Sequence, residues 1–363
     1  MSSIAMPDHP TSRPLAHGGM AEACAAVIRE VEKAVVGKRT LLQMMMAALL
    51  APGGHVLLED YPGLAKTLIA SSFAAALGMS FKRIQFTPDL LPGDITGGYV
   101  FSTGENRFVL RRGPIFSHVV LADEINRASP KTQSALLEAM QERQVTLEGE
   151  TEKLPVPFIV IATQNPIEHE GTFPLPVAQL DRFAVRLSVG YPTPQEEAQI
   201  LRQRSERMQD AVDVSPVLSP ADLLALREVA ERVYVDPDVE RYIVDLVGRT
   251  RGHRQVVVGA SPRASLALLK LARAWAAMQG RDYVIPDDVK PFAQPVLAHR
   301  VILDPSLWDV RLSDRTVIED VVRQTPVPVI PEAGRGGGAG AGAGATAGTG
   351  ARSGKPGPRF VDG

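Results

Sequence analysis

The spacing of apolar residues changes character near the middle of the chain. In the first half, short apolar runs of strand length occur at 55–59, 81–86, 118–122, 158–163 and 183–189. Between them, the segments 67–77 and 130–141 have helical spacing. Gly78 is a stop signal for the first helix, and Ser129 followed by Pro130 is a start signal for the second. Strands that alternate with helices predict an α/β fold with a parallel sheet covered on both faces.

Beyond residue 193 the strand-like runs give way to helical spacing, at 194–208, 221–233, 237–249, 262–279 and 286–298. We therefore predict an α/β core over residues 20–193 and an all-helical domain over residues 194–330. Helical spacing also covers residues 20–51 and is interrupted at 35–38. This part of the core is predicted to form two helices around a turn.

The two ends of the chain have compositions that disfavour a packed core. Residues 1–19 are rich in Pro, Ser and Gly, and we expect them to form a flexible arm. Residues 331–363 are rich in Gly and Ala and carry few apolar side chains. Such a segment buries too little surface to offset the entropy lost on ordering, so we predict a disordered tail.

Two further segments of the core, near 93–112 and 144–158, read as strand pairs joined by polar turns. We expect two hairpins inserted into the α/β core, the second with its turn near Gly149 and Glu150. By themselves, these segments read as ordinary surface hairpins.

The charge balance narrows the function classes. The formal net charge is -2 and the sequence pI is near 6.4, which argues against a protein that coats nucleic acid. The single cysteine, Cys24, excludes an internal disulfide, which fits a reducing cytosol and equally a secreted protein without disulfides. The N-terminus has no apolar signal-peptide core, and the longest apolar stretch, Leu41–Ala51, is shorter than the roughly 20 residues that span a bilayer. We expect a soluble cytoplasmic protein without a membrane segment.

A candidate phosphate loop follows the first apolar strand and precedes a helix. It reads Asp60-Tyr61-Pro62-Gly63-Leu64-Ala65-Lys66-Thr67. The phosphate-loop pattern has glycine where this chain has Asp60 and Ala65, so the segment alone also fits a plain turn. In a phosphate loop, Lys66 would lie between the β- and γ-phosphates and the Thr67 hydroxyl would face Mg²⁺. Asp60 must then point away from the phosphates.

Polar residues at the ends of later strands offer the rest of a site. A buried strand ends in Asp123 and Glu124, which is either an exposed strand end or a pair that holds Mg²⁺ and orients the attacking water. Asn165 follows another strand, although Asn-Pro is also a turn signal. Arg182 and Arg263 by themselves would be surface residues. A cation in the first turn of a helix, as at Arg263, is easier to explain beside an anion.

Taken in this order, the motifs resemble those of the AAA+ superfamily, and within it the MoxR family, over residues 20–323. They are DYPGLAKT, VVLADEINRASPKTQSALLEAMQERQVT, IATQNPIE, LPVAQLDRF and GASPRA. The resemblance implies a P-loop ATPase core with a C-terminal helical lid. It implies catalytic roles for Glu124 (Walker B), Asn165 (sensor 1), Arg182 (an arginine finger acting on a neighbouring subunit) and Arg263 (sensor 2). It implies a cofactor-binding set of Val36, Gly37, Asp60, Tyr61, Pro62, Gly63, Leu64, Ala65, Lys66, Thr67 and Leu68, with Thr67 and Asp123 at the metal.

The resemblance also offers a second interpretation of the two hairpins, as inserts that project towards a central pore and touch a client protein. The same resemblance implies a function. We expect ATP with Mg²⁺ as cofactors, bound between the core and the lid. We expect a homo-oligomeric ring, by resemblance a hexamer, with a chaperone-like role on client proteins that often carry a von Willebrand factor A domain or a metal cofactor. Two alternatives remain, a DNA-associated motor and a nucleotide-gated scaffold that hydrolyses ATP weakly. The near-neutral pI disfavours the first, and the intact pair of Asp123 and Glu124 disfavours the second.

Overall fold

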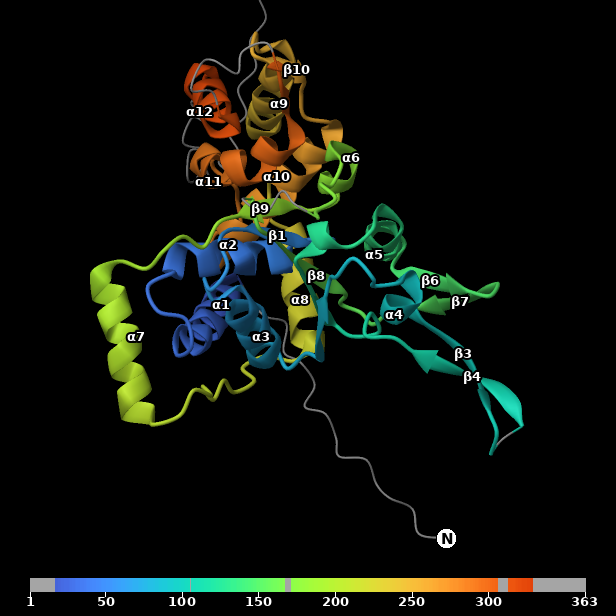
Figure 1. Ribbon diagram of the computed structural model, residues 1–363. Helices are drawn as coiled ribbons and strands as arrows, with labels where there is room; N and C mark the ends of the chain where they lie inside the picture. The colour runs from blue at the N-terminus through green and yellow to red at the C-terminus, as the bar shows by residue number, and fades with distance from the viewer. Residues whose placement is uncertain (1–16, 105, 167–170, 306–312, 329–363) are drawn as a thin grey trace, which may run out of the picture. The chain divides into compact units, whose positions relative to one another are not determined.

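The computed structural model describes residues 17–104, 106–166, 171–305 and 313–328 (Figure 1). Two helices come first, α1 (His17–Glu32) and α2 (Arg39–Leu50), separated by a turn as predicted. Helix α1 begins inside the segment predicted as a flexible arm, so the end of that segment is helical. Residues 1–16 of the predicted arm and the predicted tail at 331–363 lie outside the described residues.

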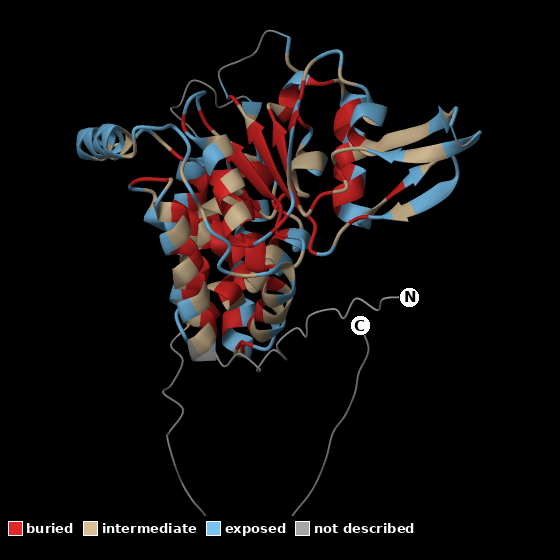
Figure 2. Cartoon of the chain, turned by 90° about the horizontal axis from the view of Figure 1, so that it is seen from below, coloured by how far each residue is buried: buried red, intermediate tan, exposed pale blue. Residues whose placement is uncertain are grey.

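The core is a five-stranded parallel sheet. Its strands are β1 (Val56–Glu59), β2 (Phe81–Gln85), β5 (Val119–Asp123), β8 (Ile159–Gln164) and β9 (Val185–Leu187), in the order β2-β5-β8-β1-β9. Every residue of β5 is buried, and the interior strands have no polar face, because a parallel sheet is covered on both sides. Figure 2 shows these strands as the buried centre of the fold. The predicted α/β fold is confirmed.

The strand order decides where a site can lie. Asp123, Gln164 and Glu59 end three neighbouring strands, so the residues that follow them meet at one edge of the sheet. Helix α3 (Lys66–Ala76) leaves β1 at this edge, and helix α5 (Pro130–Glu142) follows β5. In open α/β sheets, ligands bind at the carboxyl ends of the strands.

Both predicted hairpins are present, and apart from buried Val145 their strand residues are partly or fully exposed (Figure 2). The first consists of β3 (Gly97–Ser102) and β4 (Arg107–Arg112), and it is preceded by a short helix, α4 (Pro92–Thr96). The second consists of β6 (Gln144–Leu147) and β7 (Glu150–Lys153). Its turn contains Gly149, as predicted, and begins one residue earlier than expected. Leu147 pairs with Glu150, so Glu148 and Gly149 form the turn, with positive φ at both (50° and 92°).

The C-terminal part contains α7 (Pro194–Arg207), α8 (Pro220–Glu231), α9 (Pro237–Gly252), α10 (Pro262–Met278), α11 (Pro286–Leu297) and α12 (Asp314–Gln324). The prediction of an all-helical lid is corrected in one place. Strand β10 (Val256–Val258) pairs antiparallel with β11 (Ile302–Leu303). Three successive β-branched valines favour an extended conformation, and they find a partner strand only in the folded chain.

The helices after residue 193 pack against the first helices of the chain. Helices α8 and α10 pack against α1 and α2, so the lid helices and the first helices of the core share one interior. The described residues, which end at Pro328, accordingly form one compact unit. No helix in the described part of the chain is long and apolar enough to cross a membrane.

Candidate functional site

The loop between β1 and α3 contains two residues with positive φ and leads directly into a helix. Gly63 has a φ of 81° with nothing within 4 Å of an added Cβ, so its conformation, and not crowding, favours glycine. Ala65 is left-handed (φ 56°) and precedes α3, whose N-terminus receives no side-chain cap. The first amides of α3 therefore have no side-chain acceptor. An uncapped helix N-terminus of this kind is suited to an anion.

Asp60 begins this loop and Lys66 follows its end. The Lys66 ammonium curls back over the loop and donates to the carbonyls of Asp60 (2.5 Å) and Tyr61 (3.0 Å). The Asp60 carboxylate is turned towards the end of β9, where it accepts from the Gly190 amide (2.6 Å) and the Ser188 hydroxyl (2.8 Å). Burial raises the pKa of Asp60, but these hydrogen bonds more than offset it, and the pKa lies below its usual value. Asp60 thus remains a buried anion that stabilises the loop.

A cavity of about 430 Å³ lies in front of the loop. It is lined by Pro62, Gly63, Leu64, Ala65, Lys66, Thr67, Leu68, Arg83, Asp123, Glu124, Thr163 and Asn165. The structure therefore brings the loop, the two acids and the strand-end amide around one space. All lining residues belong to the core. This cavity corresponds to the phosphate end of the expected site, and a nucleotide held between core and lid stays a prediction.

The carboxylates of Asp123 and Glu124 both accept hydrogen bonds from protein side chains. Asp123 accepts from the Thr163 hydroxyl at Oδ1 (2.6 Å) and from Arg83 at Oδ2 (2.9 Å from Nε, 2.7 Å from Nη2). Glu124 accepts at Oε2 from the Gln85 amide (2.7 Å) and from Arg127 (3.0 Å).

Sequence reasoning missed Arg83, Gln85 and Thr163. A signal for the first two existed in the alternation along β2, where exposed Arg83 and Gln85 flank buried Ile84. Their partners became visible only with the pairing of β2 to β5, which sets Gln85 opposite Asp123.

The predicted adenine-binding residues Val36 and Gly37 do not line this cavity. Gly37 has a φ of 74°, and a Cβ there would lie 1.9 Å from Oε1 of Glu196, in the first turn of α7. The segment before α7 lies close to the residues around Gly37 and to the 60–68 loop. Tyr191 accepts a hydrogen bond from Lys38 at its carbonyl (2.9 Å), and its ring lies 5.9 Å from that of Tyr61.

Arg182 and Arg263 are brought together, but away from the loop. Both line a second cavity of about 300 Å³, to which no residue of the 60–68 loop contributes. Its charged lining consists of five cationic residues and one carboxylate, namely Arg143, Arg182, Arg263, Lys270, Arg300 and Asp181. Such an excess of positive charge is suited to an anion. Sequence reasoning missed Arg143, Lys270 and Arg300.

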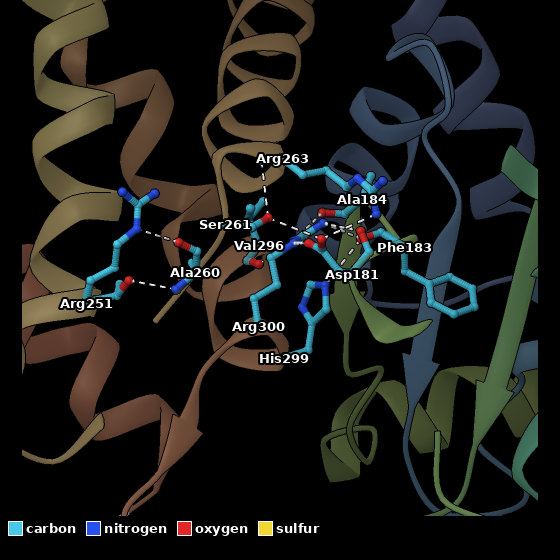
Figure 3. A network of polar contacts seen from close by, with 11 residues as sticks. Asp181, Phe183, Ala184, Arg251, Ala260, Ser261, Arg263, Val296, His299 and Arg300 are labelled. Carbon is cyan, nitrogen blue, oxygen red and sulfur yellow. Dashed lines mark hydrogen bonds and ion pairs between the residues drawn. The ribbon is translucent and has the colours of Figure 1, made fainter. Parts of the chain in front are cut away.

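Arg300 holds the segment that carries Arg182 (Figure 3). It ends a short 3₁₀ turn, Ala298–Arg300, after α11 and is 3% exposed. Its guanidinium donates to Asp181 Oδ1 (2.6 Å) and to the carbonyls of Phe183 (2.6 Å) and Ala184 (3.3 Å). Asp181 Oδ2 accepts in addition from Arg263 (3.4 Å) at the start of α10. The lid and the Arg182 segment are therefore joined by the buried contacts of Arg300 and by the exposed contact of Arg263.

The residues at the loop fit a magnesium nucleotide. The lysine, the uncapped helix start and the adjoining carboxylate supply the partners that phosphates and a divalent cation need. Among the described residues no cluster of three or more His, Cys, Asp or Glu side chains forms a separate metal cage. A cation held by one or two side chains together with phosphates is the usual arrangement for Mg²⁺. The fold and the site define a nucleotide-binding protein of the AAA+ class.

Comparison with known proteins narrows the class to a family. Residues 55–185 match the ATPase family associated with various cellular activities (AAA), and residues 248–321 match the AAA lid domain. The chain is 45% identical over 312 residues to Chaperone MoxR1 of Mycobacterium tuberculosis, covering 84% of this chain and 82% of that protein. It is 31% identical to Protein MoxR of Methylorubrum extorquens, covering 83% and 93%.

The crystal structure of a candidate ATPase from Cytophaga hutchinsonii superposes with a TM-score of 0.80 at 39% identity, covering 86% of this chain and 97% of that one. The chain belongs to the MoxR family of AAA+ ATPases.

Proposed function

We propose that this chain hydrolyses ATP with Mg²⁺ in a homo-oligomeric, by family resemblance hexameric, ring in the cytoplasm. One observation carries this proposal. Lys66, Asp123 and Glu124 line one cavity, whereas Arg182 and Arg263 line another. Phosphoryl transfer needs positive charge on the transferred group as well as a held nucleotide. We call the cavity in front of the 60–68 loop the loop cavity, and the cavity lined by Arg182 and Arg263 the arginine cavity. A complete site therefore requires the loop cavity of one copy and the arginine cavity of a second copy.

Each residue of the loop cavity has a chemical task in this proposal. Lys66 and the first amides of α3 bind the phosphates, and Thr67 and Asp123 hold the metal. Bound Mg²⁺ supplies charge neutralisation at the phosphates. Glu124 accepts the proton of the attacking water and Asn165 helps to orient that water. Val36 and Gly37, beside the start of α7, border the adenine end.

The second cavity supplies the trans-acting groups. Arg182 and Arg263 stabilise the charge on the neighbour's phosphates, and Arg300 keeps Arg182 in place. Arginine fingers that act in trans are worth roughly 10³–10⁵ in rate. Arg182→Ala should therefore lose turnover while it binds nucleotide nearly as well as the unaltered chain.

A mixing experiment tests the two-copy site. Glu124→Gln and Arg182→Ala should each be inactive alone. When they are mixed, some interfaces join an intact loop cavity to an intact Arg182, and part of the ATPase activity returns. If the two variants enter common rings and the mixture stays inactive, the two-copy site is wrong.

The work done by the ring is proposed to be chaperone-like remodelling of partner proteins, including proteins with von Willebrand factor A domains or metal cofactors. Membership of a family that includes Chaperone MoxR1 supports this. The β3–β4 hairpin is the candidate contact, because Phe101 (52% exposed) and Phe108 (67% exposed) form an edge-to-face pair on it, at 5.4 Å.

The client can be sought with Glu124→Gln, which should bind ATP without hydrolysing it and so retain a partner in a pull-down. The same variant carrying Phe101→Ser and Phe108→Ser is the matched control. A trap that enriches no partner would count against the chaperone role. Equal enrichment by both would remove the hairpin from the contact.

A further inference from the structure

The guanidinium of Arg83 lies on the side of Asp123 that faces the loop cavity. Asp123 is 8% exposed, and Thr163 engages its Oδ1. Arg83 engages Oδ2 through two nitrogens, at 2.9 and 2.7 Å. Its side chain is 51% exposed and, like Lys66 and Asp123, it lines the cavity in front of the loop. Both oxygens of the carboxylate proposed to hold Mg²⁺ therefore have protein partners.

This arrangement is in conflict with a loaded site. A divalent cation at Asp123 needs a carboxylate oxygen directly or through water, and it would be repelled by a guanidinium bonded to the same oxygen. Arg83 has a second acceptor, because its Nη2 also donates to Oε1 of Gln85 (2.7 Å) two residues along β2. The guanidinium can leave Asp123 and still keep a hydrogen-bond partner on its own strand.

We propose that Arg83 is a positioning residue that holds Asp123 in the nucleotide-free chain and gives up this contact when the site is loaded with metal. The inference rests on the proposed function, since it concerns the same magnesium nucleotide site. Arg83 then sets the thermodynamic coupling between metal and nucleotide. Coupling of this kind is reciprocal and is measured as a ratio of affinities.

The proposal predicts opposite effects with and without metal. Without metal, Arg83 cancels the charge of Asp123, which would otherwise repel the phosphates of a nucleotide. Removing Arg83 should therefore weaken metal-free binding. With metal, Arg83 competes for Asp123, and its removal should strengthen binding. A general loss of structure would weaken both.

The experiment compares Arg83→Gln with Lys82→Gln in the full chain. Lys82 is the exposed neighbour on β2, and its side chain points to the opposite face of the sheet, so the control removes the same charge from the same strand. The affinity for a fluorescent, slowly hydrolysed ATP analogue is measured in excess Mg²⁺ and in excess EDTA. For Arg83→Gln we expect the ratio of the two affinities to rise roughly tenfold, a typical size for coupling between two sites. Lys82→Gln should leave the ratio unchanged.

The outcomes separate the inference from the function on which it rests. If the unaltered chain binds the analogue in Mg²⁺ but Arg83→Gln has the same ratio as Lys82→Gln, the role of Arg83 is wrong and the nucleotide site stands. If the unaltered chain binds no nucleotide, the proposed function fails, and the inference with it. Arg83→Lys keeps the charge but not the two-nitrogen contact, so its affinity ratio should lie between those of the unaltered chain and Arg83→Gln. If Arg83→Gln does not fold, Arg83→Lys provides the test, and a ratio equal to that of the unaltered chain then overturns the proposal.

Discussion

Replacement of Arg300 by leucine tests whether a buried ion pair holds the segment that carries Arg182 in place. Arg300 is 3% exposed, and it donates to Asp181 and to the carbonyls of Phe183 and Ala184. Leucine fills part of the same volume but leaves the carboxylate and both carbonyls without this donor. Breaking a buried pair by removing one partner costs about 3–5 kcal/mol. Because the Asp181 side chain is 17% exposed and also meets Arg263, we expect the lower end, about 3 kcal/mol.

Urea unfolding followed by circular dichroism measures this loss. The matched control is Arg273→Leu, also in the lid, where the partner Glu231 lies at 3.3 Å and its side chain is 40% exposed. A pair of that kind contributes about 0–1 kcal/mol. The double variant Asp181→Leu with Arg300→Leu should be more stable than the sum of the single losses predicts. It leaves no buried charge unpaired, since Arg263, which also loses Asp181, has a half-exposed side chain.

Function gives a second measurement of the same perturbation. Arg300→Leu should lower turnover in the assembled protein, because the segment carrying Arg182 loses its support. Nucleotide affinity at the separate loop cavity should stay unchanged. An Arg300→Leu chain as stable as Arg273→Leu and as active as the unaltered chain would refute the reasoning.

Three further predictions follow from the described contacts. Burial lowers the pKa of His55 from 6.5 to about 4, so the unfolded chain binds the proton more readily than the folded chain. The free energy of unfolding should be unaffected above pH 6.5 and should fall by up to about 3 kcal/mol as the pH drops towards 4. Unfolding curves that do not change over this pH range would contradict the prediction. Gly63→Ala forces a side chain into a left-handed conformation (φ 81°) and should cost about 1 kcal/mol of stability as well as nucleotide affinity; unchanged thermal unfolding and binding would argue against strain. Lys270→Gln removes one cation from the arginine cavity and should lower the ATPase rate about tenfold, equivalent to about 1.4 kcal/mol. The loss should be smaller than that of Arg182→Ala, and a rate equal to that of the unaltered chain would exclude Lys270 from the site.

The strands and helices of the core were predictable from local pattern. The buried strand that ends in Asp123 reads as apolar throughout, and Ser129 followed by Pro130 marks the start of α5 where the structure begins it. The loop around Lys66 was weaker evidence because glycine is missing at two positions. The short pair β10 and β11 was missed, since its two strands lie far apart in sequence and neither is long enough to give a period of its own.

Local sequence thus determined the elements, the loop between β1 and α3 and the acids at the end of β5, because capping, backbone freedom and hydrophobic periodicity act within a few residues. Only the tertiary structure decided which groups meet. The pairing of β2 with β5 brings Arg83 to Asp123, a contact across 40 positions. The packing of α10 and α11 places Arg263 and Arg300 beside Asp181, and so separates the arginines from the loop. Such contacts depend on strand order and helix packing, which no short stretch of sequence encodes.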